Sequence, residues 1–250
     1  MPATVEQLLI GIHAVAAALK SAPPSVRRLV VAGECRNARV LELRQQAEAL
    51  GVQVELQPRA MLDRRSRGER HQDILAEFAA KNLWTERDLD RLLAAITRPP
   101  LILVLDCIQD PHNLGACLRT AEAAGVDLVI LSRDRSASLS PVVRRAASGA
   151  AEVVNIVTVA NLARVLRKLK DAGVWLVAAA GEAEQELYAA DLSGPLALVM
   201  GGEGQGLRRL TAELCDYHVR IPMYGTVSSL NVSVATAICV YEAIRQRNSP

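Results

Sequence analysis

Three short segments of the chain hold polar side chains where packing alone does not require them. They cover residues 106–113, 201–206 and 223–229. With the helix residues that follow, they supply amide, guanidinium, carboxylate and hydroxyl groups around glycine-rich backbone, which lets a ligand approach closely. A few placed polar groups of this kind are typical of a small-molecule site.

Each segment taken alone also fits an ordinary structural role. Asn231 is a natural cap for the apolar helix that follows it, and Ser228 and Ser229 suit a turn. Asn113 is placed to cap the helix after the first segment. Arg119, further along that helix, can extend its head into solvent. Only the combination of the three segments indicates a site.

The glycine-rich segment follows a buried strand, yet it matches neither the dinucleotide pattern nor the P-loop pattern. Its glycines stand at 201, 202, 204 and 206, with Glu203 between them. A carboxylate repels phosphate, so a ligand with a cationic or neutral polar part fits better than a nucleotide phosphate. A tight turn at the start of a helix is the alternative.

A sheet must position these segments. From residue 101 onward, short apolar stretches predict strands at 101–105, 128–131, 153–157, 174–178, 196–200 and 218–221. Between and after them, helices are predicted at 113–124, 141–148, 162–171, 206–214 and 231–247. Almost purely apolar strands that alternate with helices favour a mostly parallel sheet covered on both faces. Ligands collect at the carboxyl ends of such strands, where the three segments lie.

The first 80 residues form a smaller α/β unit. The pattern predicts helices over 5–20 and 38–50, strands over 28–32 and 52–56, and, after an arginine-rich loop, a short apolar segment over 74–78. Residues 81–100 contain a helix candidate at 86–96 and end in two prolines, which is typical of a linker. We therefore expect domains over 1–80 and 101–250, joined by a linker over 81–100.

Positive charge is concentrated between the strand predicted over 52–56 and the apolar segment over 74–78. Residues 59–70 hold five arginines against Asp63 and Glu69. Guanidinium groups bind phosphate well, so this segment suits nucleic acid. Charge alone does not decide between that role and a solvated loop.

Composition excludes several classes of protein. Half of the residues are hydrophobic and only 3% are aromatic, so the core is aliphatic. No apolar run approaches the roughly 20 residues of a membrane span, and the start of the chain lacks the basic region of a secretory signal. The five cysteines include no C-x-x-C pair, which argues against a disulfide framework or a zinc site. We expect a cytoplasmic protein with no metal and no membrane contact.

In order, the three segments resemble the three motifs of the SpoU/TrmH branch of the SPOUT RNA methyltransferases. With their flanking residues, the matching sequences are N-L-G-A-C-L-R-T-A-E-A-A-G at 113–125, M-G-G-E-G-Q-G-L at 200–207 and I-P-M-Y-G-T-V-S-S-L-N-V-S-V-A at 221–235. The joint match covers about the last 150 residues, and G-I-H-A-V and the arginine-rich segment ending in H-Q extend it over nearly the whole chain. Asp73 follows that H-Q where relatives commonly have glycine, which adds a negative charge.

This resemblance implies both a fold and an activity. The larger domain would carry a carboxyl-terminal trefoil knot that holds S-adenosylmethionine, the active unit would be a homodimer, and the amino-terminal domain would be a ribosomal-protein-like RNA-binding module. The implied activity is 2′-O-methylation of a guanosine ribose in 23S rRNA. A ribose methyltransferase acting on tRNA or another rRNA nucleotide is an alternative, and a non-catalytic RNA-binding assembly factor is a more distant one.

The resemblance also assigns residues by motif position. The implied active-site residues are Asn113, Arg119, Glu203, Ser229 and Asn231. Backbone atoms that hold the cofactor are implied at Gly201, Ile221 and Leu230. RNA contact is expected from Arg59, Arg64, Arg65, Arg67 and Arg70. Arg119 would either activate the ribose 2′-hydroxyl or stabilise the developing alkoxide. A guanidinium normally stays protonated, so the first role is chemically awkward.

Overall fold

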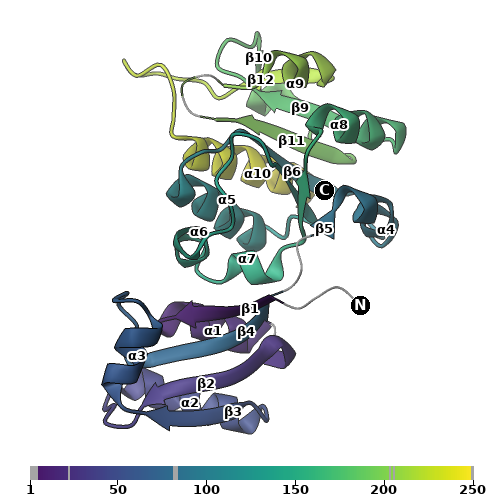
Figure 1. Cartoon of the computed structure of the whole chain (residues 1–250). Helices are drawn as coiled ribbons and strands as arrows, with labels where there is room; N and C mark the ends of the chain where they lie inside the picture. Colours follow the sequence, from purple (N-terminus) through teal and green to yellow (C-terminus); the bar gives the residue numbers. More distant parts are fainter. Residues whose placement is uncertain (1–4, 22, 81–83, 203, 205, 249–250) are drawn as a thin grey trace. The chain divides into compact units, whose positions relative to one another are not determined.

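The computed structural model describes residues 5–21, 23–80, 84–202, 204 and 206–248. The chain divides into two compact units, Met1–Asn82 with Ser148–Val153, and Leu83–Ala147 with Val154–Pro250. Each unit has its own sheet (Figure 1). The domain limits at residues 80 and 100 stay a prediction.

The first unit is built on a four-stranded sheet in the order β1-β4-β2-β3. Its strands are β1 (Val5–Ile10), β2 (Val26–Ala32), β3 (Gln53–Gln57) and β4 (Ile74–Ala80). Only β2 and β3 are parallel neighbours. Its helices are α1 (Ile12–Ser21), η1 (Pro23–Ser25), α2 (Ala38–Ala49) and α3 (Arg59–Arg65). Alternation along β2 gives Leu29 and Val31 to the core shared with α1 and α2, and Val30 to the core shared with α3.

The helix predicted over residues 5–20 is wrong in its first third. Residues 5–10 form β1, which pairs with β4 along its whole length. Gly11 adopts a φ of +89°, where L side chains are strained, and its N–H donates to the Ile74 carbonyl. The apolar spacing suits a helix, but long-range strand pairing overrides local periodicity here.

The arginine-rich segment, expected as a loop, begins with α3. The loop after it contains Arg67, Gln72 and Asp73, with φ of 53°, 52° and 63°. Buried His71 anchors this loop, because its Nδ1 accepts a hydrogen bond from the Asp73 N–H at 3.0 Å. Its Nε2 is then the donor to Asp63 Oδ1 at 2.9 Å. With its φ of 63°, Asp73 has a left-handed backbone conformation, which glycine adopts without strain.

The second unit contains an eight-stranded sheet in the order β10-β12-β9-β11-β6-β7-β8-β5, and all its paired neighbours are parallel. The strands are β5 (Trp84–Thr85), β6 (Leu101–Asp106), β7 (Leu128–Ser132), β8 (Ile156–Val159), β9 (Trp175–Ala179), β10 (Gln185–Glu186), β11 (Leu196–Gly201) and β12 (Tyr217–Arg220). The predicted parallel α/β sheet is confirmed.

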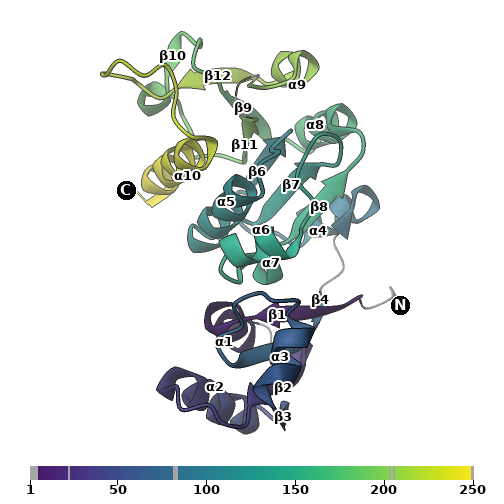
Figure 2. The same cartoon turned by 60° about the vertical axis from the view of Figure 1, so that its left-hand side comes forward.

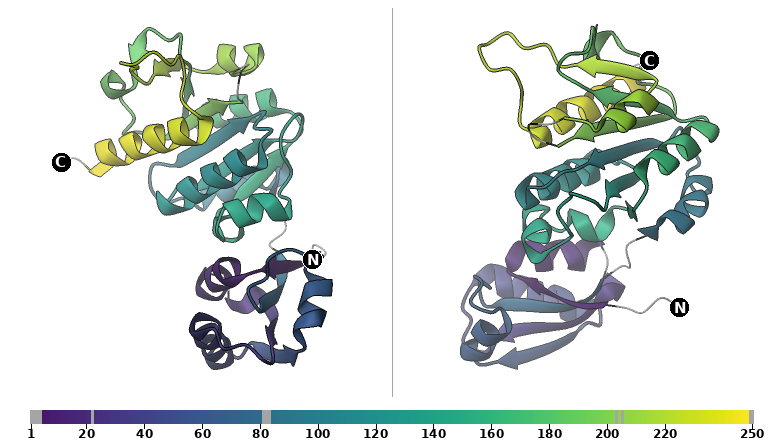
Figure 3. Two further views of the ribbon diagram at one scale, coloured as in Figure 1. Left: turned by 90° about the vertical axis from the view of Figure 1, so that its left-hand side faces the viewer. Right: turned by 45° about the horizontal axis from the view of Figure 1, so that its top comes forward.

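Helices cover both faces of this sheet. On one face lie α4 (Leu89–Ala94), α8 (Leu162–Asp171) and α9 (Arg209–Leu214). On the other face lie α5 (Pro111–Ala123), α6 (Pro141–Ala146) and α10 (Val232–Asn248), with α10 alongside α5 (Figures 2 and 3). The short helices η2 (Glu86–Asp88) and η3 (Leu187–Ala189) also belong to this unit, whereas α7 (Ala150–Val153) belongs to the first unit. Among the described residues, no helix is both long and apolar enough to cross a membrane.

Several boundaries differ from those predicted. Residues 84–94 of the expected linker fold into the second unit, where β5 pairs with β8 and Leu89 is fully buried. The strand expected from residue 153 begins at Ile156, because α7 occupies 150–153. Helix α5 begins at Pro111 and is capped by Asp110, whose side chain accepts from the His112 N–H at 2.7 Å. Asn113 is therefore not the cap of α5, because Asp110 already satisfies that end of the helix.

Gly115 lets α5 approach α6 closely. A Cβ at this position would lie 2.4 Å from the Ala146 Cβ and 2.7 Å from the Val143 carbonyl oxygen. The second contact is with backbone, which a rotamer change cannot relieve.

Gly115→Ala should lower the free energy of unfolding by about 1–3 kcal/mol, because overpacking exceeds the roughly 1 kcal/mol gained in helix propensity. Urea unfolding measures this difference. Gly194→Ala is the matched control, since nothing lies within 4 Å of its added Cβ. Equal stability of Gly115→Ala and the wild type would contradict the packing argument.

Candidate functional site

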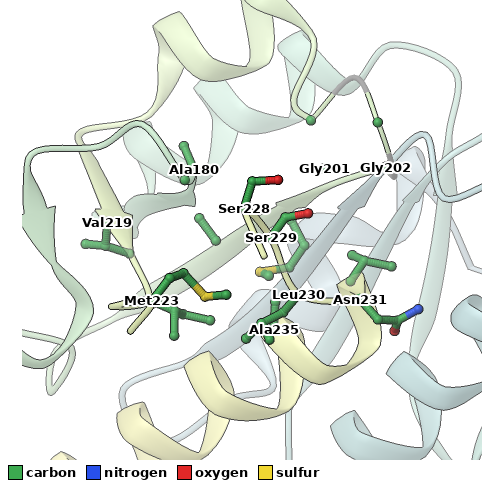
Figure 4. A pocket seen from close by; sticks show the side chains of 17 residues that line it. Ala180, Gly201, Gly202, Val219, Met223, Ser228, Ser229, Leu230, Asn231 and Ala235 are labelled. Carbon is green, nitrogen blue, oxygen red and sulfur yellow. The ribbon is translucent and has the colours of Figure 1, made fainter. Parts of the chain in front are cut away.

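A pocket of about 580 Å³ opens at the carboxyl ends of β9, β11 and β12 (Figure 4). It is lined by Ala179, Ala180, Gly181, Met200, Gly201, Gly202, Gly204, Gly206, Val219, Ile221, Met223, Ser228, Ser229, Leu230, Asn231, Val232 and Ala235. Its volume is in the range of small-molecule sites. No side chain among these described lining residues carries a charge, so the pocket suits a ligand with apolar, neutral polar or cationic parts.

Two glycines form the edge of this pocket because no larger residue fits there. A Cβ on Gly201 would lie 2.3 Å from the Gly206 carbonyl carbon, and one on Gly202 would lie 2.3 Å from the Cys107 carbonyl oxygen. Gly202 and Gly206 also form an isolated antiparallel bridge. The loop after β11 therefore folds back on itself and presses its backbone against the loop after β6.

An ion pair holds these two loops together. Asp106 ends β6 with 0% of its surface exposed. Arg208 Nη2 lies 2.6 Å from Asp106 Oδ1, and Arg208 Nε donates to Asp106 Oδ2 at 3.2 Å. Hydrogen bonding to this carboxylate raises the pKa of the Arg208 guanidinium. The bidentate pair fixes the carboxyl-terminal side of the glycine loop to β6, and the pairing of β11 with β6 holds its other side.

Cys107, the residue after Asp106, connects the loop after β6 to the end of β7. Its φ is +60°, and its N–H donates to the Ser132 hydroxyl at 2.9 Å. Burial, followed by the neighbouring Asp106 carboxylate, raises the pKa of its thiol. The thiol therefore stays protonated at neutral pH, and Cys107 serves as a loop anchor. Among the described residues, no group of three or more His, Cys, Asp and Glu side chains could hold a metal ion.

Asn231 joins the first and third segments. Its Oδ1 accepts from the Ser233 N–H at 2.9 Å, which caps α10 as predicted. Its Nδ2 donates to Asn113 Oδ1 at 3.0 Å. Figure 4 shows the Asn231 side chain directed away from Met223, from the start of α10. Asn231 therefore both caps the helix and connects it to α5.

The structure brings most of the predicted residues together. Gly201, Ile221, Ser229, Leu230 and Asn231 line the pocket. Asn113 is 8% exposed and lies beside it through its bond to Asn231.

Two predicted residues lie elsewhere or cannot be placed. Arg119 is exposed on α5 and is not part of the pocket lining. Glu203 lies outside the described residues.

Sequence reasoning missed Arg208 and Asp106 as a pair. Asp106 ends a run of apolar strand residues, and Arg208 follows the glycines two residues after Gly206. A buried carboxylate at a strand end needs a partner, and this was the signal available. The identity of that partner depends on β6 and β11 being neighbours.

A second hollow, of about 1130 Å³, adjoins the pocket and shares Gly202, Gly206 and Val232 with it. We call it the arginine groove. The groove is lined by Cys107, Ile108, Gln109, Asp110, Asn113, Arg135, Gly202, Gly206, Leu207, Arg208, Arg209 and Val232. Unlike the pocket, it contains cationic side chains.

The arginines of the first unit divide into two groups. Arg64, Arg67 and Arg70 are exposed, and so is Arg59, which lies 3.5 Å from Asp73. Arg65 is half-buried and ion-paired with Glu77 on β4. Four of the five predicted RNA-binding arginines are thus presented to solvent, and one is engaged within the unit.

Comparison with known families gives two matches that together span most of the chain. Residues 100–241 match the SpoU rRNA Methylase family. Residues 8–84 match the family described as RNA 2′-O ribose methyltransferase substrate binding.

Individual proteins match over nearly the full length. The chain is 50% identical to the 23S rRNA (guanosine-2′-O-)-methyltransferase RlmB of Shewanella oneidensis, over 98% of this chain and 99% of that protein. It is 51% identical to RlmB of Pseudomonas putida, over 96% of each. Among solved structures, the SpoU methyltransferase AviRb of Streptomyces viridochromogenes in complex with the cofactor AdoMet aligns with a TM-score of 0.80. That alignment has 25% identity and covers 98% of this chain and 92% of AviRb.

Gly202→Ala should weaken S-adenosylmethionine binding by at least about tenfold, because the added Cβ collides with backbone and moves the pocket edge by more than the tolerance of a placed site. Calorimetry with the purified protein measures the affinity. Gly225→Ala is the matched control in the third segment, where nothing lies within 4 Å of the added Cβ. Wild-type affinity in Gly202→Ala would show that this edge does not hold the cofactor.

Proposed function

This chain belongs to the SpoU rRNA methylase family, and from that premise we propose that it transfers a methyl group from S-adenosylmethionine to a guanosine ribose 2′-oxygen of 23S rRNA. One observation carries the proposal. Residues of the second and third motifs line one pocket whose described lining carries no charged side chain, and Asn113 of the first motif, far upstream, is hydrogen-bonded to Asn231 in its wall. The near full-length similarity to 23S rRNA methyltransferases supports the substrate.

The pocket fits this cofactor. S-adenosylmethionine supplies an electrophilic methyl group on a positively charged sulfur. The described lining holds no cation that would repel that sulfur, and small side chains at Ala179, Ala180 and Ala235 leave room for a flat ring. Backbone groups at Gly201, Ile221 and Leu230 would hold the adenosine part, while the Ser229 hydroxyl offers a further hydrogen bond.

Asn113 and Asn231 would shape the wall next to the reacting ribose. Their hydrogen bond fixes both amides, so neither must be ordered when RNA binds. Proximity and alignment in such a fixed site can supply about 7–11 kcal/mol of the barrier reduction at best. Glu203 is proposed as an active-site residue on its motif position alone.

We propose that Arg119 stabilises the developing alkoxide. A guanidinium group is normally a permanent cation, so electrostatic stabilisation is the role that suits an arginine here. Because it does not line the pocket of its own chain, we propose that it acts in the pocket of a second copy.

A homodimer is supported by the surface of α10. Val234 and Tyr241, seven residues apart on one side of that helix, are 47% and 49% exposed. An apolar stripe of this kind is typical of a helix that packs against a partner. The helix that carries Arg119, α5, lies alongside α10, and we propose that the dimer face extends to Arg119.

The remaining parts of the proposal concern fold and location. We propose that the carboxyl-terminal segment forms a trefoil knot, an exception to the rule that chains avoid knots. Its support is that α10 returns from β12 to pack on α5 and β11. The first unit would bind RNA through Arg59, Arg64, Arg67 and Arg70, in keeping with its family match. An enzyme acting on rRNA would work in the cytoplasm.

The purified protein should transfer labelled methyl from S-adenosylmethionine to unmodified 23S rRNA transcript and leave a tRNA transcript unlabelled. Ribose-methylation mapping of the product should find a single 2′-O-methylguanosine. Preferential labelling of tRNA would favour the tRNA alternative. Binding of RNA without any methyl transfer would favour a non-catalytic factor.

Arg119→Ala should abolish methyl transfer while keeping cofactor affinity, and it should regain activity when mixed with Gly202→Ala. In a mixed dimer, the intact pocket of one copy faces the intact arginine of the other. At an S-adenosylmethionine concentration too low for Gly202→Ala to turn over alone, random exchange of the two variants then restores about a quarter of wild-type activity in a symmetric dimer. Circular dichroism and light scattering first establish that both variants are folded and dimeric. Complete inactivity of the mixture would place Arg119 in the site of its own chain.

A further inference from the structure

The arginine groove is built from loops at the carboxyl ends of three strands. Gln109 belongs to the loop after β6, Arg135 to the loop after β7, and Arg208 to the loop after β11. The groove meets the cofactor pocket at Gly202 and Gly206, which line both. A chain that lies in the groove therefore passes beside whatever occupies the pocket.

Among the described lining residues, the charged side chains of the groove are mostly positive. Asp110 is its only acidic lining residue among those described, and both its carboxylate oxygens are used. Oδ1 accepts from the His112 N–H, and Oδ2 accepts from Asn113 Nδ2 at 3.5 Å. Arg135, Arg208 and Arg209 supply three cations against it.

These three arginines are not equally available. Arg209 is ion-paired with Glu213 at 3.3 Å. Arg208 uses one edge of its guanidinium on Asp106, yet 40% of its side chain stays exposed. Arg135 is exposed, and within the described parts of the chain its side chain has no hydrogen bond or ion pair. Arg135 is the cation with most to gain from an anionic ligand.

The loop that carries Arg135 is braced. The Ala137 N–H donates to the Ile108 carbonyl at 2.7 Å, and the hydroxyls of Ser132 and Ser136 lie 2.8 Å apart. Ser132 in turn accepts from the Cys107 N–H. Arg135 itself has a φ of +56°. Its Cα is thus fixed at the groove edge, and only the side chain has to be ordered when a ligand binds.

We propose that the arginine groove holds the RNA strand at the methylated nucleotide, with Arg135 and the exposed edge of Arg208 binding the phosphates that flank it. This rests on the proposed function, because the groove can hold the methylated nucleotide only if the adjoining pocket binds the methyl donor. Guanidinium forks match phosphate oxygens and bind them with charge-assisted hydrogen bonds. Contacts to phosphate set the register of the strand and carry no base preference.

Arg135→Ala is the test, and Arg133→Ala is its matched control. Arg133 is exposed in the same loop but does not line the groove. Arg135→Ala should bind 23S rRNA transcript about tenfold more weakly, the loss of one charge-assisted contact. The slope of log affinity against log salt should fall by about 0.7–0.9, as expected for one phosphate contact. Arg133→Ala should resemble the wild type in both measurements.

Two further readouts keep this proposal separable from the function itself. S-adenosylmethionine affinity, measured by calorimetry, should be unchanged in Arg135→Ala, and methyl transfer should show a raised KM for RNA. If Arg135→Ala and Arg133→Ala are indistinguishable in RNA affinity and salt slope while the wild type methylates 23S rRNA, the groove assignment is overturned and the function stands. If the wild type binds the transcript without methylating it and only Arg135→Ala binds more weakly, the function fails and the groove remains an RNA site.

Discussion

The contact between the loops after β6 and β11 is the constraint on which the rest of the site depends. Asp106 is buried and its charge must be matched, which the Arg208 fork does. Gly202 lies against the Cys107 carbonyl, with no space for a Cβ. The ion pair and the backbone contact therefore both position the pocket edge formed by the loop after β11. The pocket on one side of this edge and the arginine groove on the other take their shape from it.

A hydrogen bond between two asparagines connects the site to the carboxyl-terminal helix α10. The Asn113–Asn231 hydrogen bond links residues 118 positions apart in the sequence. Since Asn231 is also the cap of α10, the start of that helix and the wall of the site are set by one side chain. Cys117 and Thr236 extend the contact between α5 and α10 into the core, where burial raises the pKa of the Cys117 thiol to about 11.

The sequence predicted what depends on local pattern and on strand order. Apolar strands alternating with helices gave the parallel sheet, and the third-segment residues fall on one pocket with Gly201. It failed where a partner distant in the sequence decides, since β1 is a strand because β4 pairs with it. It also misplaced a local cap, because Asp110, three residues before Asn113, caps α5. Arg208 could not be singled out, because its role exists only when β11 is beside β6.

The distribution of charge across the site separates two ligands of opposite sign. The cofactor bears a positive sulfur, and the described lining of its pocket has no charged side chain. RNA is a polyanion, and the adjoining groove offers Arg135 and part of Arg208. A groove without arginines would leave the phosphates unmatched. Because Asp106 neutralises one edge of Arg208, the groove can lie next to the pocket without extending strong positive charge into it. The same ion pair that fixes the geometry thus also sets the boundary between the two electrostatic environments.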